Sequence, residues 1–205
     1  MDDIDHLCQR IPALVPCRDS IEQVTKKLIQ CFQNGNKLLL CGNGGSAADC
    51  EHISGELIKR FSKPRPLPEE LSNRLGADLS QNLHQGLPAL SLPSMIGFHT
   101  AFANDDDPAY AFAQQVLAFG QAGDVLLAIS TSGNSTNLIH AVNTAKELGV
   151  IPIALTGQSG GRLASLCELT IHAPASDTPR VQELHLPIYH SICTVVEETL
   201  FPKSD

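Results

Sequence analysis

The sequence predicts a three-layer α/β/α fold, in which helices cover both faces of a central parallel sheet and long helices lie near both ends of the chain. Two observations predict this fold. Short continuous apolar runs, such as residues 37–41 and 124–129, are typical of strands that are buried on both faces. These runs alternate with stretches of helical periodicity, which favours a parallel sheet built from right-handed crossovers.

The first elements follow from local signals before and after the first apolar run. Residues 19–34 carry apolar side chains at helical spacing, and Asp19 or Ser20 can cap this helix. The strand at 37–41 then leads through a glycine-rich loop into a helix over 47–61. This order predicts a helix–strand–helix start to the fold.

The middle of the chain contains a segment that does not fit the alternating pattern. Residues 62–86 are rich in proline, polar and charged residues, with one possible helix at 68–75. We expect this segment to be an excursion inserted into a single domain that spans residues 1–205. Beyond it, a strand at 87–92 and a helix at 109–119 resume the fold.

The second half repeats the alternation of strand and helix. The buried strand at 124–129 leads through a polar loop into a helix at 136–148, which Gly149 ends. The remaining predicted elements are strands at 150–155 and 169–173 and a long helix at 181–200, with Pro187 expected to kink that helix.

Composition excludes several functional classes. The 205 residues suit one domain, and the formal net charge of -8 argues against a nucleic-acid surface, although it leaves a small phosphorylated ligand possible. Seven cysteines without a C-x-x-C pair indicate reduced thiols in a cytoplasmic protein. No signal-peptide pattern and no apolar run long enough to span a membrane is present in the sequence.

Two loops carry the chemical signal, because each follows a buried strand and opens a helix. In the first, from Cys41 to Ser46, glycines let the backbone approach a ligand. This loop also fits the dinucleotide pattern G-x-G-x-x-G/A, but the acidic residue expected about 20 positions later is absent. A tight turn without a ligand is a further alternative.

The second loop, Ser130 to Ser135, holds four hydroxyl groups and a glycine at a helix start. Capping needs only one hydroxyl, so the remaining three are available to a phosphate. A helix cap with solvated neighbours is the alternative. The Walker lysine of nucleotide P-loops is missing.

Together, the segments CGNGGSAAD and GDVLLAISTSGNS resemble the SIS sugar-isomerase family, and within it the phosphoheptose isomerases. The resemblance extends from about residue 34 to the C-terminus, interrupted by residues 62–86. It implies a flavodoxin-like SIS fold and conversion of sedoheptulose 7-phosphate to D-glycero-D-manno-heptose 7-phosphate through an enediol. It also implies a homotetramer with sites at subunit interfaces, without nucleic-acid or membrane partners.

The resemblance further implies a metal and acid–base set. His52 and Glu56 share one helix face, and Gln182 and His190 lie eight residues apart on the last helix. By this match all four are zinc ligands, and Glu56 and His190 are also catalytic. Eight residues of ideal helix span about 12 Å, too far for both side chains to meet one ion easily. From the residues alone, an ordinary surface pair is favoured over a metal site for His52 and Glu56, and an ordinary core histidine is favoured for His190.

The same match gives a set of substrate-binding residues. These are Asn43, Gly44, Gly45, Glu56, Asn104, Asp105, Ser130, Thr131, Ser132, Ser135 and Gln182. Arg60 is expected to reach the phosphate across a subunit boundary. Asp106 and Asp107 have a simpler interpretation as caps of a helix before Pro108.

Two departures from the family pattern leave other functions open. The excursion at 62–86 is about twenty residues longer than the corresponding connection, and Pro179 stands where the family often has an acidic residue. A non-catalytic scaffold of the type that associates with the DnaA initiator is one alternative, motivated by the segment from Thr199 to Pro202. An isomerase or sensor for another phosphosugar is the other.

Overall fold

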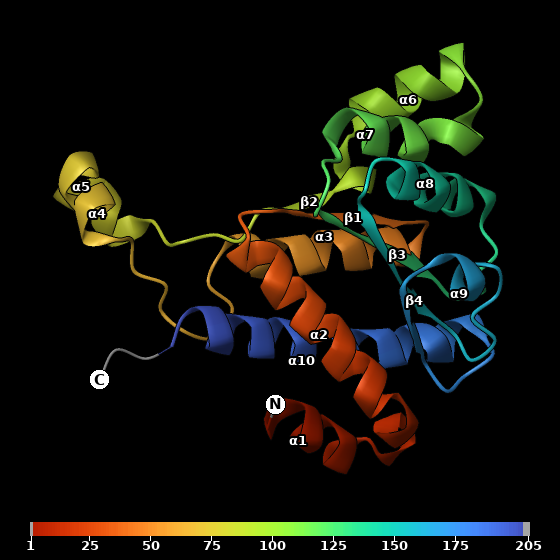
Figure 1. The fold of residues 1–205 in the computed structure, drawn as a ribbon, viewed down its shortest axis with the longest axis horizontal. Helices are drawn as coiled ribbons and strands as arrows, with labels where there is room; N and C mark the ends of the chain where they lie inside the picture. The colour runs from red at the N-terminus through yellow and green to blue at the C-terminus, as the bar shows by residue number, and fades with distance from the viewer. Residues whose placement is uncertain (1, 203–205) are drawn as a thin grey trace.

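The computed structural model describes residues 2–202 and has three layers around a parallel sheet (Figure 1). The five strands of the sheet run in the order β2-β1-β3-β4-β5, and every neighbouring pair is parallel. Their bounds are β1 (Leu38–Gly42), β2 (Ala89–Ser91), β3 (Val125–Ser130), β4 (Ile151–Thr156) and β5 (Leu169–His172). The predicted three-layer α/β fold is confirmed.

Alternation along the strands divides the core between the two faces of the sheet. Leu38 and Leu40 of β1 point into one apolar cluster, whereas Leu39 and Cys41 point into the other. The first cluster lies under α1 (Asp2–Arg10), α2 (Arg18–Gln33), α3 (Gly45–Ile58) and α10 (Thr178–Leu200), and the second under α7 (Ala111–Phe119), α8 (Thr136–Glu147) and α9 (Leu163–Leu166). Because both faces are covered, the central strands β1, β3 and β4 are largely apolar and buried.

Several predicted details are wrong. Neither Asp19 nor Ser20 caps α2, since the 3-10 turn η1 (Pro12–Cys17) continues directly into the helix and Cys17 already has helical dihedral angles. The expected helix at 109–119 begins as the 3-10 turn η3 (Pro108–Tyr110) before α7. Helix α6 (Ile96–Asp105), which has no buried residue, and η2 (Leu92–Ser94) were not predicted.

The excursion forms an arm that extends away from the sheet (Figure 1). It carries α4 (Glu69–Leu75), as predicted, and also α5 (Ala77–Asn82). Gly76, with a φ of 80°, separates the two short helices. Neither helix has a buried residue, so α4 and α5 add nothing to the core of the described chain.

Candidate functional site

A cavity of about 300 Å³ lies where the chain leaves β1 and β3. The strand order 2-1-3-4-5 reverses direction between these two strands, and ligands in open α/β sheets bind at such a switch point. Eight of the predicted substrate-binding residues line the cavity: Asn43, Gly44, Gly45, Ser130, Thr131, Ser132, Ser135 and Gln182. The structure therefore brings together the two loops that the sequence singled out.

Three helices begin at this cavity: α3 at Gly45, α8 at Thr136 and α10 at Thr178. The first amides of a helix lack partners within it and carry partial positive charge, which favours an anion. Thr178 also lines the cavity, and its hydroxyl lies 3.4 Å from that of Thr131. Sequence analysis missed Thr178, although its place at the start of the last helix was a usable signal.

Hydrogen bonds within the β3–α8 loop fix its conformation. Ser130 Oγ accepts from the Gly133 amide at 3.1 Å and lies 3.3 Å from Ser135 Oγ. Ser135 is the N-cap of α8, but its side chain makes no capping hydrogen bond. Capping therefore does not account for the hydroxyl groups of this loop.

Gln182 lies against the glycine-rich loop. A Cβ atom added to Gly45 would be 2.3 Å from Gln182 Nε2, so glycine at this position permits the close approach. The amides of Asn43 and Asn137 exchange two hydrogen bonds of 3.0 and 2.9 Å across the same loop. Gln182 thus belongs to the cavity, at the beginning of α10.

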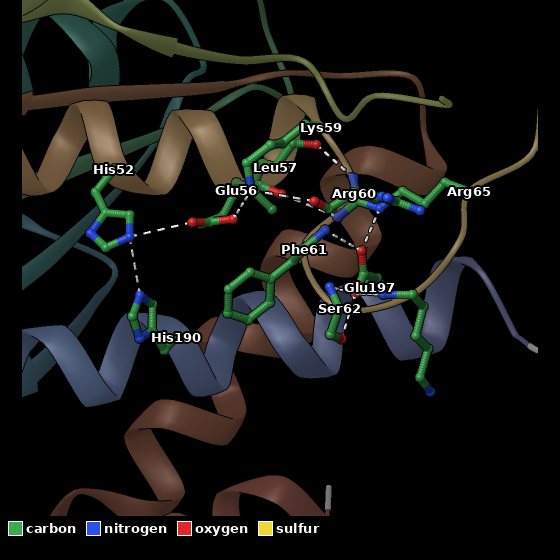
Figure 2. Close-up of polar contacts among 11 residues, drawn as sticks. His52, Glu56, Leu57, Lys59, Arg60, Phe61, Ser62, Arg65, His190 and Glu197 are labelled. Atoms are coloured by element: carbon green, nitrogen blue, oxygen red, sulfur yellow. Dashed lines mark hydrogen bonds and ion pairs between the residues drawn. The ribbon is translucent and has the colours of Figure 1, made fainter. Parts of the chain in front are cut away.

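A second group of side chains lies further along α3 and α10 (Figure 2). His52 Nε2 is 3.3 Å from both Glu56 Oε1 and His190 Nε2. Glu56 also pairs with Lys59. Burial and the neighbouring His52 lower the pKa of His190, and the Glu56 carboxylate opposes this shift only partly. His190 is half-buried and hydrogen-bonded, not the core histidine of the simpler interpretation.

Behind His52 lies a pair that sequence analysis missed. The buried Tyr189 hydroxyl lies 3.0 Å from His52 Nδ1 and 3.2 Å from Asp49 Oδ1. Burial raises the pKa of the Asp49 carboxyl, against the hydrogen bond from Tyr189 and the nearby His52. Asp49 lies one helical turn before His52, a spacing that was visible in the sequence.

The predicted zinc ligands do not surround one point. His52, Glu56 and His190 supply nitrogen and oxygen donors of the type that zinc accepts, whereas Gln182 lies at Gly45. Among residues 2–202, no group of three or more His, Cys, Asp or Glu side chains is arranged to hold a metal ion. The donor chemistry fits the metal, but the side-chain arrangement does not.

Two predicted substrate contacts lie away from the cavity. Asn104 and Asp105 are exposed at the end of α6, where the Asn104 amide donates to Asp105 at 2.8 Å. The polar contacts of the described chain do not link them to either loop. Asp107 accepts from the Ala109 amide and caps η3, as its simpler interpretation predicted. Arg60 is exposed just after α3.

Comparison with known proteins places these features in a family. The SIS domain family matches residues 2–86 and 96–194. The chain is 45% identical to the phosphoheptose isomerase of Aneurinibacillus thermoaerophilus, over 88% of this chain and 82% of that protein. It is 39% identical to the phosphoheptose isomerase of Shewanella loihica, over 100% and 96% of the two chains. The structure of phosphoheptose isomerase GmhA from Neisseria gonorrhoeae superposes with a TM-score of 0.74 at 33% identity, covering 95% of this chain and 91% of that one. This chain therefore belongs to the phosphoheptose isomerase family of SIS-domain proteins.

Proposed function

We propose that the protein is an aldose–ketose isomerase that converts sedoheptulose 7-phosphate to D-glycero-D-manno-heptose 7-phosphate. The observation that carries this proposal is the contact of His52 with both Glu56 and His190, on two of the three helices that begin at the cavity. An acid–base pair next to an anion site is what the isomerisation of a sugar phosphate requires.

The phosphate would occupy the cavity between the two loops. Ser130, Thr131, Ser132 and Ser135 supply hydroxyl donors, and the helix starts supply amides and partial positive charge. Asn43 and Gln182 would bind sugar hydroxyls. Asn104, Asp105 and Arg60 lie outside this cavity, and we propose that they contact the sugar phosphate of a neighbouring subunit.

Glu56 is proposed to move the carbon-bound proton. It takes a proton from C1 of the ketose, forming an enediol, and returns a proton to C2 to give the aldose. His190 exchanges the matching proton between the oxygens on C1 and C2, so no proton is gained or lost overall. The lowered pKa of His190 keeps its ring neutral at physiological pH, where it can accept a proton and return it.

We also propose that one zinc ion binds per subunit after His52, Glu56, His190 and Gln182 rearrange. Bound there, the ion would supply Lewis-acid polarisation of the substrate oxygens. Metal analysis of the purified protein tests this directly.

We further propose that the protein is a cytoplasmic homotetramer. Within residues 2–202, no helix is long and apolar enough to cross a membrane.

The test of the reaction is turnover of sedoheptulose 7-phosphate, with the aldoheptose phosphate followed by NMR. Glu56→Gln removes the base and keeps the side-chain shape, so we expect kcat to fall by about 10²–10⁴-fold. Glu51→Gln is the matched control, because Glu51 is exposed on the same helix and contacts Ser94 instead. Full activity of Glu56→Gln would refute the proposed role, and turnover of only pentose or hexose phosphates would refute the proposed substrate.

A further inference from the structure

His52 is the contact that Glu56 and His190 share, and its other ring nitrogen faces a buried phenol. Tyr189 Oη lies 3.0 Å from His52 Nδ1 and 3.2 Å from Asp49 Oδ1, while the two rings meet edge to face at 5.4 Å. Tyr189 is 2% exposed. The phenol is therefore fixed between a carboxylate and an imidazole.

The available hydrogens decide the direction of these bonds. A phenol carries one hydrogen, and an ionised carboxylate can only accept. Among residues 2–202, Asp49 Oδ2 is buried without a hydrogen-bond partner, whereas Asp49 Oδ1 accepts from the Tyr189 hydroxyl. Because the phenol hydrogen is directed to Asp49, the phenol oxygen can only accept a hydrogen bond from the group on its other side. That group is His52 Nδ1.

We propose that Asp49 and Tyr189 are positioning residues that hold neutral His52 as the Nδ1–H tautomer, with the Nε2 lone pair available to accept from His190. The chain of donors runs from His52 Nδ1–H to Tyr189 Oη, and from Tyr189 O–H to Asp49 Oδ1. Orienting a functional histidine through its second nitrogen is an established role for such partners.

This tautomer has a consequence for the acid–base pair. In this tautomer His52 Nε2 carries no hydrogen, so it accepts the N–H of His190 Nε2 across 3.3 Å. This bond fixes the orientation of the His190 ring. The opposite tautomer would direct an N–H at Glu56 Oε1, also at 3.3 Å, and would weaken that carboxylate as a base. Asp49 and Tyr189 thus keep Glu56 free of a hydrogen bond from His52.

The direct test is the tautomer of His52 in the metal-free, ¹⁵N-labelled full chain, read from two-bond ¹H–¹⁵N correlations of the imidazole ring at a pH where it is neutral. The His52 signals are identified by their absence in His52→Gln. We expect Nδ1–H in the unaltered protein. An Nε2–H ring there would overturn the proposal, and this outcome is read in the unaltered protein.

Two variants extend the test by different routes. Tyr189→Phe deletes the acceptor for Nδ1–H. Asp49→Asn supplies an amide donor to the phenol oxygen, so the phenol hydrogen turns to His52 Nδ1. We expect both to shift the ring to Nε2–H. Tyr110→Phe is the matched control, because Tyr110 is the only other tyrosine and stacks on His140. Variants that leave the Nδ1–H tautomer unchanged would overturn the proposal.

A kinetic readout rests on the proposed function. We expect kcat of Tyr189→Phe to fall by about 10–100-fold with KM unchanged, the range seen when partners of functional histidines are lost. A fall in kcat without the tautomer shift would overturn the positioning role, because phenylalanine keeps the ring and removes only the hydroxyl group. Because the NMR measurement needs no turnover, failure of the isomerase proposal and failure of this one are distinguishable.

Discussion

At the scale of single residues, the site depends on side chains that share one face of α3. Asp49, His52 and Glu56 lie three and four residues apart, so they form a row that faces Tyr189 and His190 on α10. Burial raises the pKa of Tyr189, with Asp49 adding to the effect, and the phenol therefore stays protonated at the pH where the enzyme would work. A neutral donor held between two helices gives the row a fixed geometry.

Gly133, in the middle of the β3–α8 loop, leads to a prediction about stability. Its φ is 66°, and an added Cβ would lie 2.0 Å from the Gly160 carbonyl oxygen, a backbone atom that cannot move alone. We expect Gly133→Ala to lower the free energy of unfolding by more than the roughly 1–2 kcal/mol that left-handed backbone alone costs. Urea denaturation measures this loss.

Gly97 provides the control for that substitution. It lies near the start of α6, where no other part of residues 2–202 beyond the adjoining helix backbone comes within 4 Å of an added Cβ, and its φ is not positive. Gly97→Ala should therefore be neutral or should stabilise the protein by about 0.4–1 kcal/mol. Equal effects of the two substitutions would show that the tight contact between Gly133 and Gly160 does not govern stability.

At the scale of elements, the end of α3 is fixed to α10 by one buried carboxylate (Figure 2). Glu197 accepts hydrogen bonds from the amides of Phe61, Ser62 and Lys63 and from Arg65 Nε at 2.7 Å. Arg65 in turn donates to the carbonyl oxygens of Leu57 and Glu56, at 2.6 and 3.3 Å. This network, here called the Glu197 clamp, holds the backbone that presents Glu56.

The Glu197 clamp predicts a pH-dependent stability. Burial alone would raise the pKa of Glu197, but the Ser62 and Phe61 amides, the Ser62 hydroxyl and Arg65 hold it at about 2, below its usual 4.5. A folded-state pKa below the unfolded value adds stability above pH 4.5, and this contribution disappears as the pH falls towards 2. The lowering corresponds to about 3 kcal/mol.

Substitution of this carboxylate tests the prediction. Glu197→Gln leaves Arg65 buried without a counter-ion, so we expect a loss of about 3–5 kcal/mol at pH 7. The difference from the unaltered protein should shrink between pH 4.5 and 2, as measured by urea denaturation across that range. Glu198→Gln, which removes an exposed partner of Lys63, is the control and should cost under about 1 kcal/mol. A constant difference at all pH values would contradict the assignment.

Much of the fold at this scale was predictable, because buried parallel strands are short apolar runs. All five strands were predicted, with bounds that shift by one or two residues, such as 37–41 against Leu38–Gly42. Helix α6 was missed because it buries no residue and so has no apolar stripe to detect. The absent cap on α2 was missed because the preceding 3-10 turn has no distinctive sequence signal.

The candidate site was predictable where it is local in sequence. The loops at Gly44 and Ser132 could be identified from their glycine and hydroxyl residues. They meet because the carboxyl ends of β1 and β3 are adjacent. The contact of Tyr189 with Asp49 joins residues 140 positions apart, and such pairs follow only from the packing of α10 on α3. The separation of Gln182 from His190 was foreseen as a difficulty of helix length.

At the scale of the whole molecule, the arm is the part least connected to the rest. Its base is closed by hydrogen bonds from Gln85 to the carbonyl oxygens of Arg65 and Pro66, at 2.8 and 2.6 Å. Beyond this neck, α4 and α5 have seven and six residues and no buried side chain. Helices this short are not stable in water by themselves. The arm therefore gains little stability from contacts within its own chain.

Removal of the arm tests whether its contacts come from another subunit. Replacing residues 69–83 by a short Gly-Ser linker removes both helices and keeps the neck and the Glu197 clamp. If the arm contacts only solvent, the free energy of unfolding should change by less than about 0.5 kcal/mol and light scattering should give the same mass. A loss that grows at higher protein concentration, together with a smaller mass, would instead mean that the arm binds a neighbouring subunit, because stability linked to assembly depends on subunit concentration.

The exposed Leu79 and Leu83 are the side chains that such an interface would cover. Substituting both, as Leu79→Ser with Leu83→Ser in the full chain, should then reproduce the loss.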